Sequence, residues 1–388
     1  MFTSGFISSE GVGEGHPDKV ADYISDSILD ACLEQDPDSR VACETLVKSN
    51  CVVLAGEIST RANVSHEAVV REAIRSVGYI GEKDVFCADG VFISNWLTRQ
   101  SPEISNAVSL PVISGKSKSV GAGDQGFFFG YACNETPEYL PAPYVFAQKL
   151  CEALSCHRKE GQIRWLRPDA KSLVTMRYEE THPVEIENIV ISTQHDETVS
   201  HKEIEAFCRD VLVPGVIPDR WLHPRIHYFI NPGGPFVQGG PAADCGLTGR
   251  KIIVDTYGGV AHHGGGAFSG KDASKVDRSA AYFCRWVAKN IVAAGLAHKV
   301  EVRLAYVIGG TSPIHYDLTT FGTEQTNLEH LKRAIPKVFD ASMAGIVEAL
   351  DLRVSRYRKT TLFGHFTKPS MPWEQINRVE ALRACCGR

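Results

Sequence analysis

The sequence lacks the marks of several large classes of protein. It has no apolar run of the roughly 18 residues that a membrane-spanning helix needs and no basic or long apolar segment in its first residues. It also lacks an excess of positive charge, because 41 Lys and Arg stand against 46 Asp and Glu, for a net charge of −5. Broad nucleic-acid binding needs a basic surface, so we do not expect nucleic acid as a partner. Because a membrane span and a signal segment are also missing, we expect no membrane partner and a cytoplasmic location.

Paired cysteine motifs are missing as well, although the chain has 12 cysteines. No Cys-x-x-Cys occurs, and most of the cysteines lie singly inside apolar segments. We therefore interpret them as free thiols in a reducing compartment. The sequence also offers no persuasive Ser-His-Asp or Cys-His set of the kind that activates a nucleophile.

What the sequence does contain is one pattern of elements repeated three times. In each repeat an apolar strand leads through a loop into an amphipathic helix, and two strands, a second helix and a closing strand follow. In the first repeat, the opening strand is predicted at 5–10, the first helix at 16–35, the strand pair at 41–48 and 51–59, the second helix near 65–79 and the closing strand near 90–95. In the second, the same elements are predicted at 126–132, 141–156, 171–178 and 184–195, 200–213 and 225–230. In the third, they are predicted at 250–257, 274–296, 299–308 and 314–321, 327–350 and 360–366.

This repeat predicts an α+β fold of three pseudo-symmetric β-α-β-β-α-β units, each a sheet with helices on one face. We expect an N-terminal unit at 1–104, a central unit at 121–240 and a C-terminal unit at 241–388. The segment 105–120 between the first two is rich in Ser, Gly and Lys, and is either a plain linker or a mobile gate over a site.

The glycine-rich segment 264–277 is the strongest candidate for a functional loop. It places Lys271 and Lys275 beside Asp272 and Asp277. Glycines let backbone N–H groups approach a polyphosphate, ammonium groups neutralise it, and a carboxylate can hold a divalent metal. The spacing G-x-x-x-x-G-K is present, but Asp272 stands where a P-loop needs Ser or Thr to bind magnesium. The segment therefore predicts a triphosphate site of another kind.

The corresponding loop of the first unit, 11–19, is also rich in glycine and charge, whereas that of the second, 134–143, has no Lys, Arg or His. The first and third units are thus expected to build the site, and their loops could meet only across a subunit contact. His16 is either a helix N-terminal histidine bonded to its own backbone or a donor to an anionic leaving group. Asp18 is either a first-turn carboxylate or, with Asp277, a magnesium ligand.

Three further stretches carry candidate site residues. Arg250 and Lys251 are either solubility charges or a clamp on phosphate, and Lys171 adds a cation just before a strand. The turn 231–236 exposes Phe236, either as ordinary turn chemistry or as a stacking face for a base. The G-x-G-x-x-G at 121–126 is discounted as a dinucleotide fingerprint, because a strand rather than a helix follows it.

Together the motifs at 15–19, 121–126, 244–251 and 264–272 closely resemble those of the S-adenosylmethionine synthases, or methionine adenosyltransferases, and the resemblance covers essentially the whole chain. That family condenses ATP with methionine, releases the triphosphate and cleaves it to pyrophosphate and phosphate. The resemblance implies Mg²⁺, two per site, and K⁺ as cofactors. It also implies self-association as a dimer or a dimer of dimers, with sites between subunits.

The resemblance further assigns roles to individual residues. The expected catalytic residues are His16, Lys171, Arg250 and Lys271. The expected ATP-binding residues are His16, Asp169, Lys171, Phe236, Asp244, Arg250, Lys251, Ala267 and Lys271, and the expected methionine-binding residues are Glu57, Gln100, Asp124, Asp244 and Lys275. Asp18 and Asp277 are expected to bind Mg²⁺ and Glu44 to bind K⁺, with Cys245 near the K⁺.

The sequence departs from the family's usual pattern at Pro235, before the expected adenine-stacking residue, and in a first loop with more glycine than usual. Two other functions stay open at this point. One is an ATP-hydrolysing P-loop protein, against which Asp272 argues. The other is a catalytically silent regulatory partner, which would be expected to lack the phosphate-binding cations that this chain has.

Overall fold

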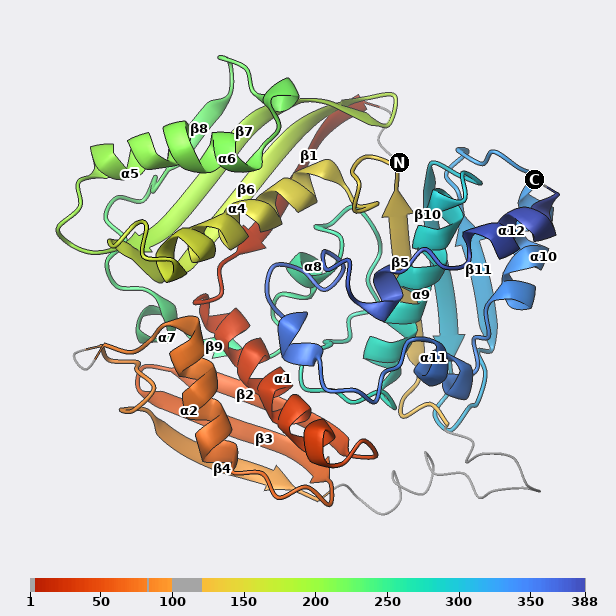
Figure 1. The fold of residues 1–388 in the computed structure, drawn as a ribbon, viewed down its shortest axis with the longest axis horizontal. Helices are drawn as coiled ribbons and strands as arrows, with labels where there is room; N and C mark the ends of the chain where they lie inside the picture. The colour runs from red at the N-terminus through yellow and green to blue at the C-terminus, as the bar shows by residue number, and fades with distance from the viewer. Residues whose placement is uncertain (1–3, 82–83, 100–120, 388) are drawn as a thin grey trace.

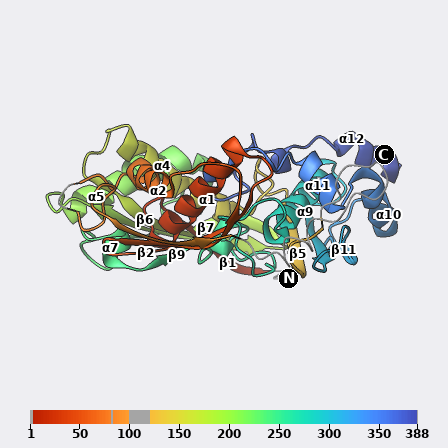
Figure 2. The same cartoon turned by 90° about the horizontal axis from the view of Figure 1, so that it is seen from below.

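The computed structural model describes residues 4–81, 84–99 and 121–387. They form three β-sheets whose helices lie mainly on one side, so that the α+β fold predicted from the repeat is confirmed (Figures 1 and 2). Gln100 and the expected gate at 105–120 lie outside the described residues.

The first sheet has the strand order β4-β3-β2-β9 and is packed against α1 and α2. Its elements are α1 (Pro17–Gln35), β2 (Arg40–Lys48), β3 (Cys51–Ser59), α2 (His66–Val77), β4 (Phe92–Thr98) and β9 (Gly246–Leu247). The helix, the strand pair, the second helix and the closing strand therefore all lie where their periodicity predicts them. The burial of alternate β2 residues, such as Val41, Cys43 and Val47, against the helices explains why this pattern could be recognised.

The second sheet has the order β1-β6-β7-β8. Its elements are β1 (Ser4–Val12), α4 (Ala142–Lys159), β6 (Leu166–Glu179), β7 (His182–His195), α5 (His201–Phe207), a π-helical turn (Cys208–Leu212), α6 (Val213–Val216), a 3₁₀ turn (Asp219–Trp221) and β8 (His227–Ile230). The long hairpin of β6 and β7 forms its centre, and α4 covers it. Residues from this sheet and its helices form a hydrophobic core of their own.

The third sheet has the order β11-β10-β5, with α9 packed on β5 and β10. The elements of this part of the chain are β5 (Gly126–Cys133), α7 (Gly240–Ala243), α8 (Ile252–Asp255), α9 (Val276–Ala293), β10 (Lys299–Tyr306), β11 (His315–Thr319), α10 (Leu328–Val338), α11 (Met343–Ala349), two 3₁₀ turns (Tyr357–Lys359 and Pro372–Glu374) and α12 (Val379–Cys386). A second core cluster joins this sheet to the first.

In each repeat, the strand that precedes the first helix does not join the sheet of that repeat. β1, which precedes α1, pairs with β6 of the second sheet, and β5, which precedes α4, pairs with β10 of the third. β9, which precedes α9, pairs with β2 of the first. Each sheet thus receives a strand from the chain segment that opens another repeat, and the exchange is cyclic. Since the strands carry the loops that follow them, this exchange brings loops from distant parts of the sequence together.

Two of the predicted strands are wrong. Residues 250–257 contain the short helix α8 instead of a strand, because Asp255 is buried in an ion pair with Lys19 and the Val254 carbonyl accepts from Gln148. Residues 360–366 form no strand because Phe363 and Gly364 have φ of 60° and 88°, in the left-handed region that an extended chain does not use. Tertiary contacts override the β propensity of both segments.

The second helix of the third repeat is also not continuous. The prediction of one helix near 327–350 is replaced by α10 and α11, separated by a short extended segment. Pro336 lies near the end of α10, and Ser342 caps the start of α11 by accepting from the Gly345 N–H. A proline close to the helix end and a capping serine shortly after it explain the break.

On the described strands, several large apolar side chains are exposed. They are Phe6 on β1, Phe92 and Trp96 on β4, Phe127 on β5 and Phe229 on β8. Because the helices bury one face of each sheet, these side chains belong to the faces that no helix covers (Figure 2). None of the described helices is long and apolar enough to cross a membrane.

Candidate active site

The loop between β1 and α1 is fixed by backbone bonds to the start of β6. The Gly13 N–H donates to the Ala170 carbonyl at 2.7 Å and the Gly15 N–H to the Pro168 carbonyl at 3.0 Å. A Cβ at Gly15 would lie 2.4 Å from the Pro168 carbonyl carbon, so the close approach requires glycine here. This contact brings Asp169 and Lys171 towards the start of α1.

His16 is the N-cap of α1 and is only 5% exposed. Its Nδ1 accepts from the Asp18 N–H at 3.2 Å, which is the backbone bond that the simpler interpretation predicts. Because Nδ1 is an acceptor, a neutral ring carries its proton on Nε2. The ring therefore keeps one N–H available for a ligand.

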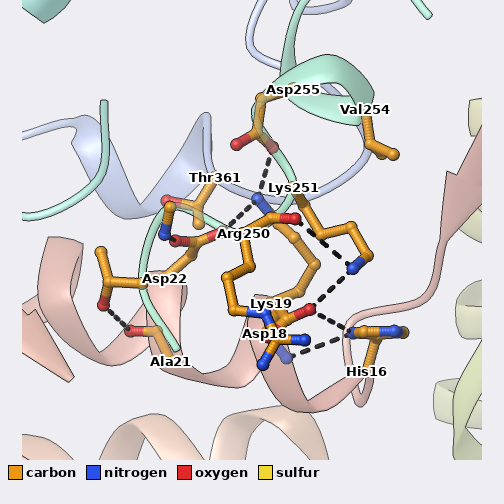
Figure 3. Close-up of polar contacts among 12 residues, drawn as sticks. His16, Asp18, Lys19, Ala21, Asp22, Arg250, Lys251, Val254, Asp255 and Thr361 are labelled. Carbon is orange, nitrogen blue, oxygen red and sulfur yellow. Dashed lines mark hydrogen bonds and ion pairs between the residues drawn. The ribbon is translucent and has the colours of Figure 1, made fainter. Parts of the chain in front are cut away.

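Asp18 is held by β9 and the residues that follow it. Its Oδ2 lies 2.7 Å from Lys251 Nζ, and its Oδ1 accepts from the Leu247 N–H at 3.0 Å and lies 3.6 Å from Arg250 Nε (Figure 3). Burial raises the pKa of this carboxyl, but Lys251 and the Leu247 N–H outweigh it and hold the pKa below its usual value. Asp18 is thus an ionised carboxylate between two cations.

The same side chains control the charge of the histidine. Burial, followed by the positive charges of Lys251 and Lys171, lowers the pKa of His16 to about 3, although Asp18 and Asp244 oppose the shift. His16 is therefore neutral at physiological pH. Burial also raises the pKa of Asp169 to about 7, against the Gly240 N–H that donates to it at 2.7 Å.

We call this group the His16 cluster. It consists of His16, Asp18, Asp169, Lys171, Asp244, Arg250 and Lys251. Half-buried Phe236 adjoins it through Gln194, whose Oε1 accepts from the Asp169 N–H while its Nε2 donates to the Val237 carbonyl. The structure thus brings together three cations, a neutral imidazole and an aromatic ring from three distant stretches of the sequence.

The second group surrounds the glycine-rich loop and is called the Lys271 cluster. Its expected site residues are Lys271, Lys275, Asp277, Glu57 and Asp124. Lys271 Nζ lies 2.6 Å from Asp277 Oδ2, and Lys275 Nζ lies 3.2 Å from Asp272 Oδ2. A Cβ at Gly266 would lie 2.1 Å from Asp277 Oδ1, so the loop passes directly over this carboxylate.

Backbone contacts place the other members of the Lys271 cluster. Ala42 of β2 forms a β-bridge with Lys271 on one side and pairs with Glu57 of β3 on the other. The Gly123 N–H donates to the Ser274 carbonyl at 3.0 Å, which sets the exposed Asp124 next to the Lys275 loop. Glu57 and Asp124, two of the candidate methionine residues, therefore lie next to the Lys271 and Lys275 loop.

Asp272 explains why the P-loop spacing is misleading. Its Oδ2 accepts from the Val41 N–H at 2.8 Å and its Oδ1 from the Ser274 N–H at 2.9 Å, and the side chain is 2% exposed. The residue at the position of a P-loop Ser or Thr thus anchors the glycine-rich loop to β2. It is occupied by backbone donors rather than free to bind a metal.

Within the described residues, no hydrogen bond or ion pair joins a side chain of the His16 cluster to one of the Lys271 cluster. The two loops do touch, since a Cβ at Gly249 would lie 2.6 Å from the Cβ of Ala267. The clusters are therefore neighbours in one chain that each hold their own carboxylates and lysines.

Three family sequence models match the chain in succession. They are the N-terminal, central and C-terminal domains of S-adenosylmethionine synthetase, at residues 4–102, 119–236 and 238–375. The chain belongs to the S-adenosylmethionine synthetase family.

Individual relatives agree with this membership. An S-adenosylmethionine synthase of Akkermansia muciniphila is 57% identical over 381 residues, which cover 97% of this chain and 96% of that protein. S-adenosylmethionine synthases of two Treponema pallidum strains are each 48% identical over 375 residues, covering 96% of this chain and 95% of theirs.

The expected potassium residues are not brought together in the structure. Val47 pairs with Gly246, so Cys245 lies at the Lys48 end of β2, whereas Glu44 lies three residues before Val47. Glu44 is exposed and Cys245 is half-buried. Among the described residues, no group of three or more His, Cys, Asp or Glu gathers as a metal site.

Sequence reasoning missed a row of aspartates along α1. Asp22, Asp26 and Asp30 follow Asp18 at intervals of four residues, and all are at most 2% exposed. Asp26 forms an ion pair with Arg278 and accepts from the Gly270 N–H at 2.8 Å, while Asp30 accepts from the backbone of 356–358. The spacing i, i+4, which places residues on one helix face, was the available signal. This row fixes both site loops to α1.

Proposed function

We propose that this protein is a methionine adenosyltransferase, which forms S-adenosylmethionine from ATP and L-methionine and then hydrolyses the released triphosphate to pyrophosphate and phosphate. The observation that carries the proposal is the His16 cluster, where Lys171, Arg250 and Lys251 surround a neutral histidine at the start of a helix. Such a set of fixed cations suits a polyanionic leaving group.

The chemistry requires little of the protein at the nucleophile. The methionine sulfur attacks C5′ of ATP, a C–S bond forms as the C5′–O bond breaks, and the thioether has no proton to lose. No general base is needed, in line with the absence of a nucleophile–base set in the sequence. The barrier lies in the charge that develops on the departing triphosphate, which pre-positioned cations and N–H donors stabilise.

Each cluster supplies part of that stabilisation. We assign His16 Nε2–H to the oxygen that leaves C5′, because its other ring nitrogen is already an acceptor. Lys171, Arg250, Lys251 and Lys271 hold phosphates. Half-buried Phe236 stacks on adenine, and Ala267 and Asp169 line the nucleotide site. Glu57, Asp124 and Lys275 receive methionine together with Asp244 and Gln100, the last of which lies outside the described residues.

Two magnesium ions per site fit the carboxylates that are present. Asp18 and Asp277 offer carboxylate oxygens next to lysines that the triphosphate would attract, and Mg²⁺ prefers carboxylate and phosphate oxygens. Bound Mg²⁺ would neutralise part of the triphosphate charge. Potassium is assigned to exposed Glu44 on β2. Cys245, which the resemblance puts near the ion, lies beside the Lys48 end of that strand.

We further propose a dimer or a dimer of dimers with the active sites between subunits. Two observations support this assembly. In the described part of one chain no hydrogen bond or ion pair joins side chains of the two clusters, and the exposed apolar side chains of β1, β4, β5 and β8 need a partner surface. The domain boundaries 1–104, 105–120, 121–240 and 241–388 and a cytoplasmic location remain proposals. The cysteines from Cys32 to Cys385 are free thiols, as a reducing compartment favours.

One assay tests the activity against its alternatives. The protein is incubated with ATP, methionine, Mg²⁺ and K⁺, and sulfonium product, pyrophosphate and phosphate are quantified by mass spectrometry and ion chromatography. Methionine-dependent formation of all three supports the proposal. ATP loss without methionine dependence would instead indicate a P-loop-like ATPase, and no turnover would indicate a non-catalytic regulatory subunit.

A further inference from the structure

A cavity of about 650 Å³ lies in the C-terminal part of the molecule, away from both clusters. It is lined by residues of α9, β11, the second half of α10 and the segment between α10 and α11, and these elements lie side by side in Figure 1. This volume is within the range of pockets that hold small molecules. Nothing in the proposed reaction uses it.

The walls of the cavity are mainly aromatic and aliphatic. Phe283, Phe339 and Tyr316 contribute rings, and Ile335 and Val338 contribute branched chains. Phe283 and Phe339 are 1% and 3% exposed, whereas Lys337 and Asp340 are exposed, so the cavity opens at the surface and reaches down to the hydrophobic core. Walls of this kind favour a flat, mostly apolar occupant.

Two polar groups of the lining have no partner within the described part of the chain. The buried Tyr316 hydroxyl makes no hydrogen bond, and no carboxylate there pairs with exposed Lys337. Asp340, the acidic residue of the lining, already accepts from the Ser342 N–H at 2.8 Å. A buried hydroxyl without a partner costs free energy, which an acceptor on a ligand would recover.

A short chain of contacts leads from the cavity to the Lys271 cluster. Ser312 and Pro313 of its lining belong to the connection between β10 and β11. In this connection the Gly309 N–H donates to the Ala122 carbonyl, and the Gly310 carbonyl accepts from the Ala122 N–H, both at 2.8 Å. Ala122 directly precedes Gly123 and Asp124, whose loop is bonded to Ser274.

We propose that this cavity is a binding site for a small aromatic anion, and that its occupation changes the affinity of the enzyme for methionine through the β10–β11 connection. The rings hold the flat part of the ligand, Lys337 pairs with its charge and the Tyr316 hydroxyl donates to it. The second half of this proposal rests on the proposed function, because Asp124 and Lys275 are two of the candidate methionine residues.

The test uses 8-anilinonaphthalene-1-sulfonate, a fluorescent aromatic anion, with the folded full-length protein. We expect saturable binding of one dye per chain. Lys337→Gln should weaken it about threefold or more through loss of the charge pair, and Tyr316→Phe should weaken it through loss of the donor. Val338→Trp fills the cavity and should weaken it by about tenfold or more. Lys202→Gln, an exposed lysine on α5, is the matched control and should bind like the wild type.

Circular dichroism and melting temperature show whether each variant is folded. If Val338→Trp does not fold, Lys337→Gln still tests the site. Saturating dye should change the KM for methionine about twofold or more in the wild type but not in Val338→Trp. Wild-type binding in both Lys337→Gln and Tyr316→Phe would overturn the site, and an unchanged KM would overturn the coupling. If the protein shows no turnover, the proposed function fails, while the dye titrations still decide on the cavity.

Discussion

Lys251 Nζ lies 2.7 Å from Asp18 Oδ2, and the second cluster repeats this arrangement with Lys271 Nζ 2.6 Å from Asp277 Oδ2. In each pair, a residue proposed to bind phosphate holds a residue proposed to bind Mg²⁺. The paired charges stabilise each other. Addition of MgATP would supply a new partner of opposite charge for each member at once.

The first prediction concerns Lys271. Lys271→Ala should lower turnover by about 10²-fold or more, because it removes a fixed charge aimed at the leaving group. The melting temperature should change little, since the Lys271 side chain is partly exposed. Steady-state kinetics measure the turnover of the variant and the wild type, and differential scanning calorimetry measures their melting temperatures.

Lys332→Ala provides the matched control, because Lys332 forms a 3.0 Å ion pair with Asp317 and neither residue belongs to either cluster. It should keep wild-type turnover. If Lys271→Ala retained most of its activity, Lys271 would be only a surface cation.

The second prediction concerns magnesium. Asp18→Asn removes a negative charge but keeps the shape of the side chain, so Mg²⁺ should bind more weakly while the fold is kept. The Mg²⁺ concentration for half-maximal turnover should rise by about tenfold or more. Activity measured over a Mg²⁺ titration at fixed ATP checks this, and removal of Mg²⁺ with a chelator should abolish turnover in the wild type. An unchanged titration curve for Asp18→Asn would show that Asp18 serves the ion pair alone.

The third prediction concerns the buried pair of Asp26 and Arg278. Asp26→Ala leaves the Arg278 guanidinium, whose side chain is 1% exposed, without its carboxylate. The free energy of unfolding should fall by about 3–5 kcal/mol. Urea denaturation measures it. The control is Glu72→Ala, which breaks an exposed ion pair with Arg75 and should lower the free energy of unfolding by less than about 1 kcal/mol. Equal losses of stability in the two variants would contradict the structural role of Asp26.

The fourth prediction is a pH dependence of stability. Hydrogen bonds from the Arg61 side chain and backbone hold the pKa of Asp36 well below its ordinary value of 3.8. Because the folded pKa lies below the unfolded one, the stabilisation is complete above the unfolded pKa and is lost as the pH falls towards the folded pKa. Asp36→Asn should therefore be less stable than the wild type at pH 7.

That difference in the free energy of unfolding should stay constant down to about pH 5 and shrink below about pH 4. Urea unfolding of both proteins at a series of pH values measures it. A difference that persisted unchanged at the acid end of the series would exclude this origin.

The sequence was sufficient for those elements whose pattern is local. The apolar face of α1, the alternation in β2 and the charges of the glycine-rich loop each depend on residues close together in the chain. Family motifs then identified the candidate residues of both clusters. The strand exchange could not be predicted in this way, because alternation along β1 shows that it is a strand but does not show that β6 is its partner.

The strand predicted at 250–257 was wrong for a related reason. In 250–257 the apolar residues suggest β structure, yet the ion pair of Asp255 with Lys19, 236 residues away, fixes a helical turn. The aspartates of α1 are a further example. Their spacing is visible in the sequence, but that they face loops of the C-terminal segment follows only from the tertiary fold.

The central claim is that each active site combines the His16 cluster of one subunit with the Lys271 cluster of another. Mixing denatured Lys251→Ala and Lys271→Ala chains in equal amounts and refolding them together tests it directly, because half of the dimers are then hybrids that contain one unaltered site. We predict that the mixture regains about a quarter of wild-type S-adenosylmethionine formation, although neither variant refolded alone does so. A mixture that stays as inactive as its parents, with hybrids demonstrated by mass spectrometry, would contradict the shared site.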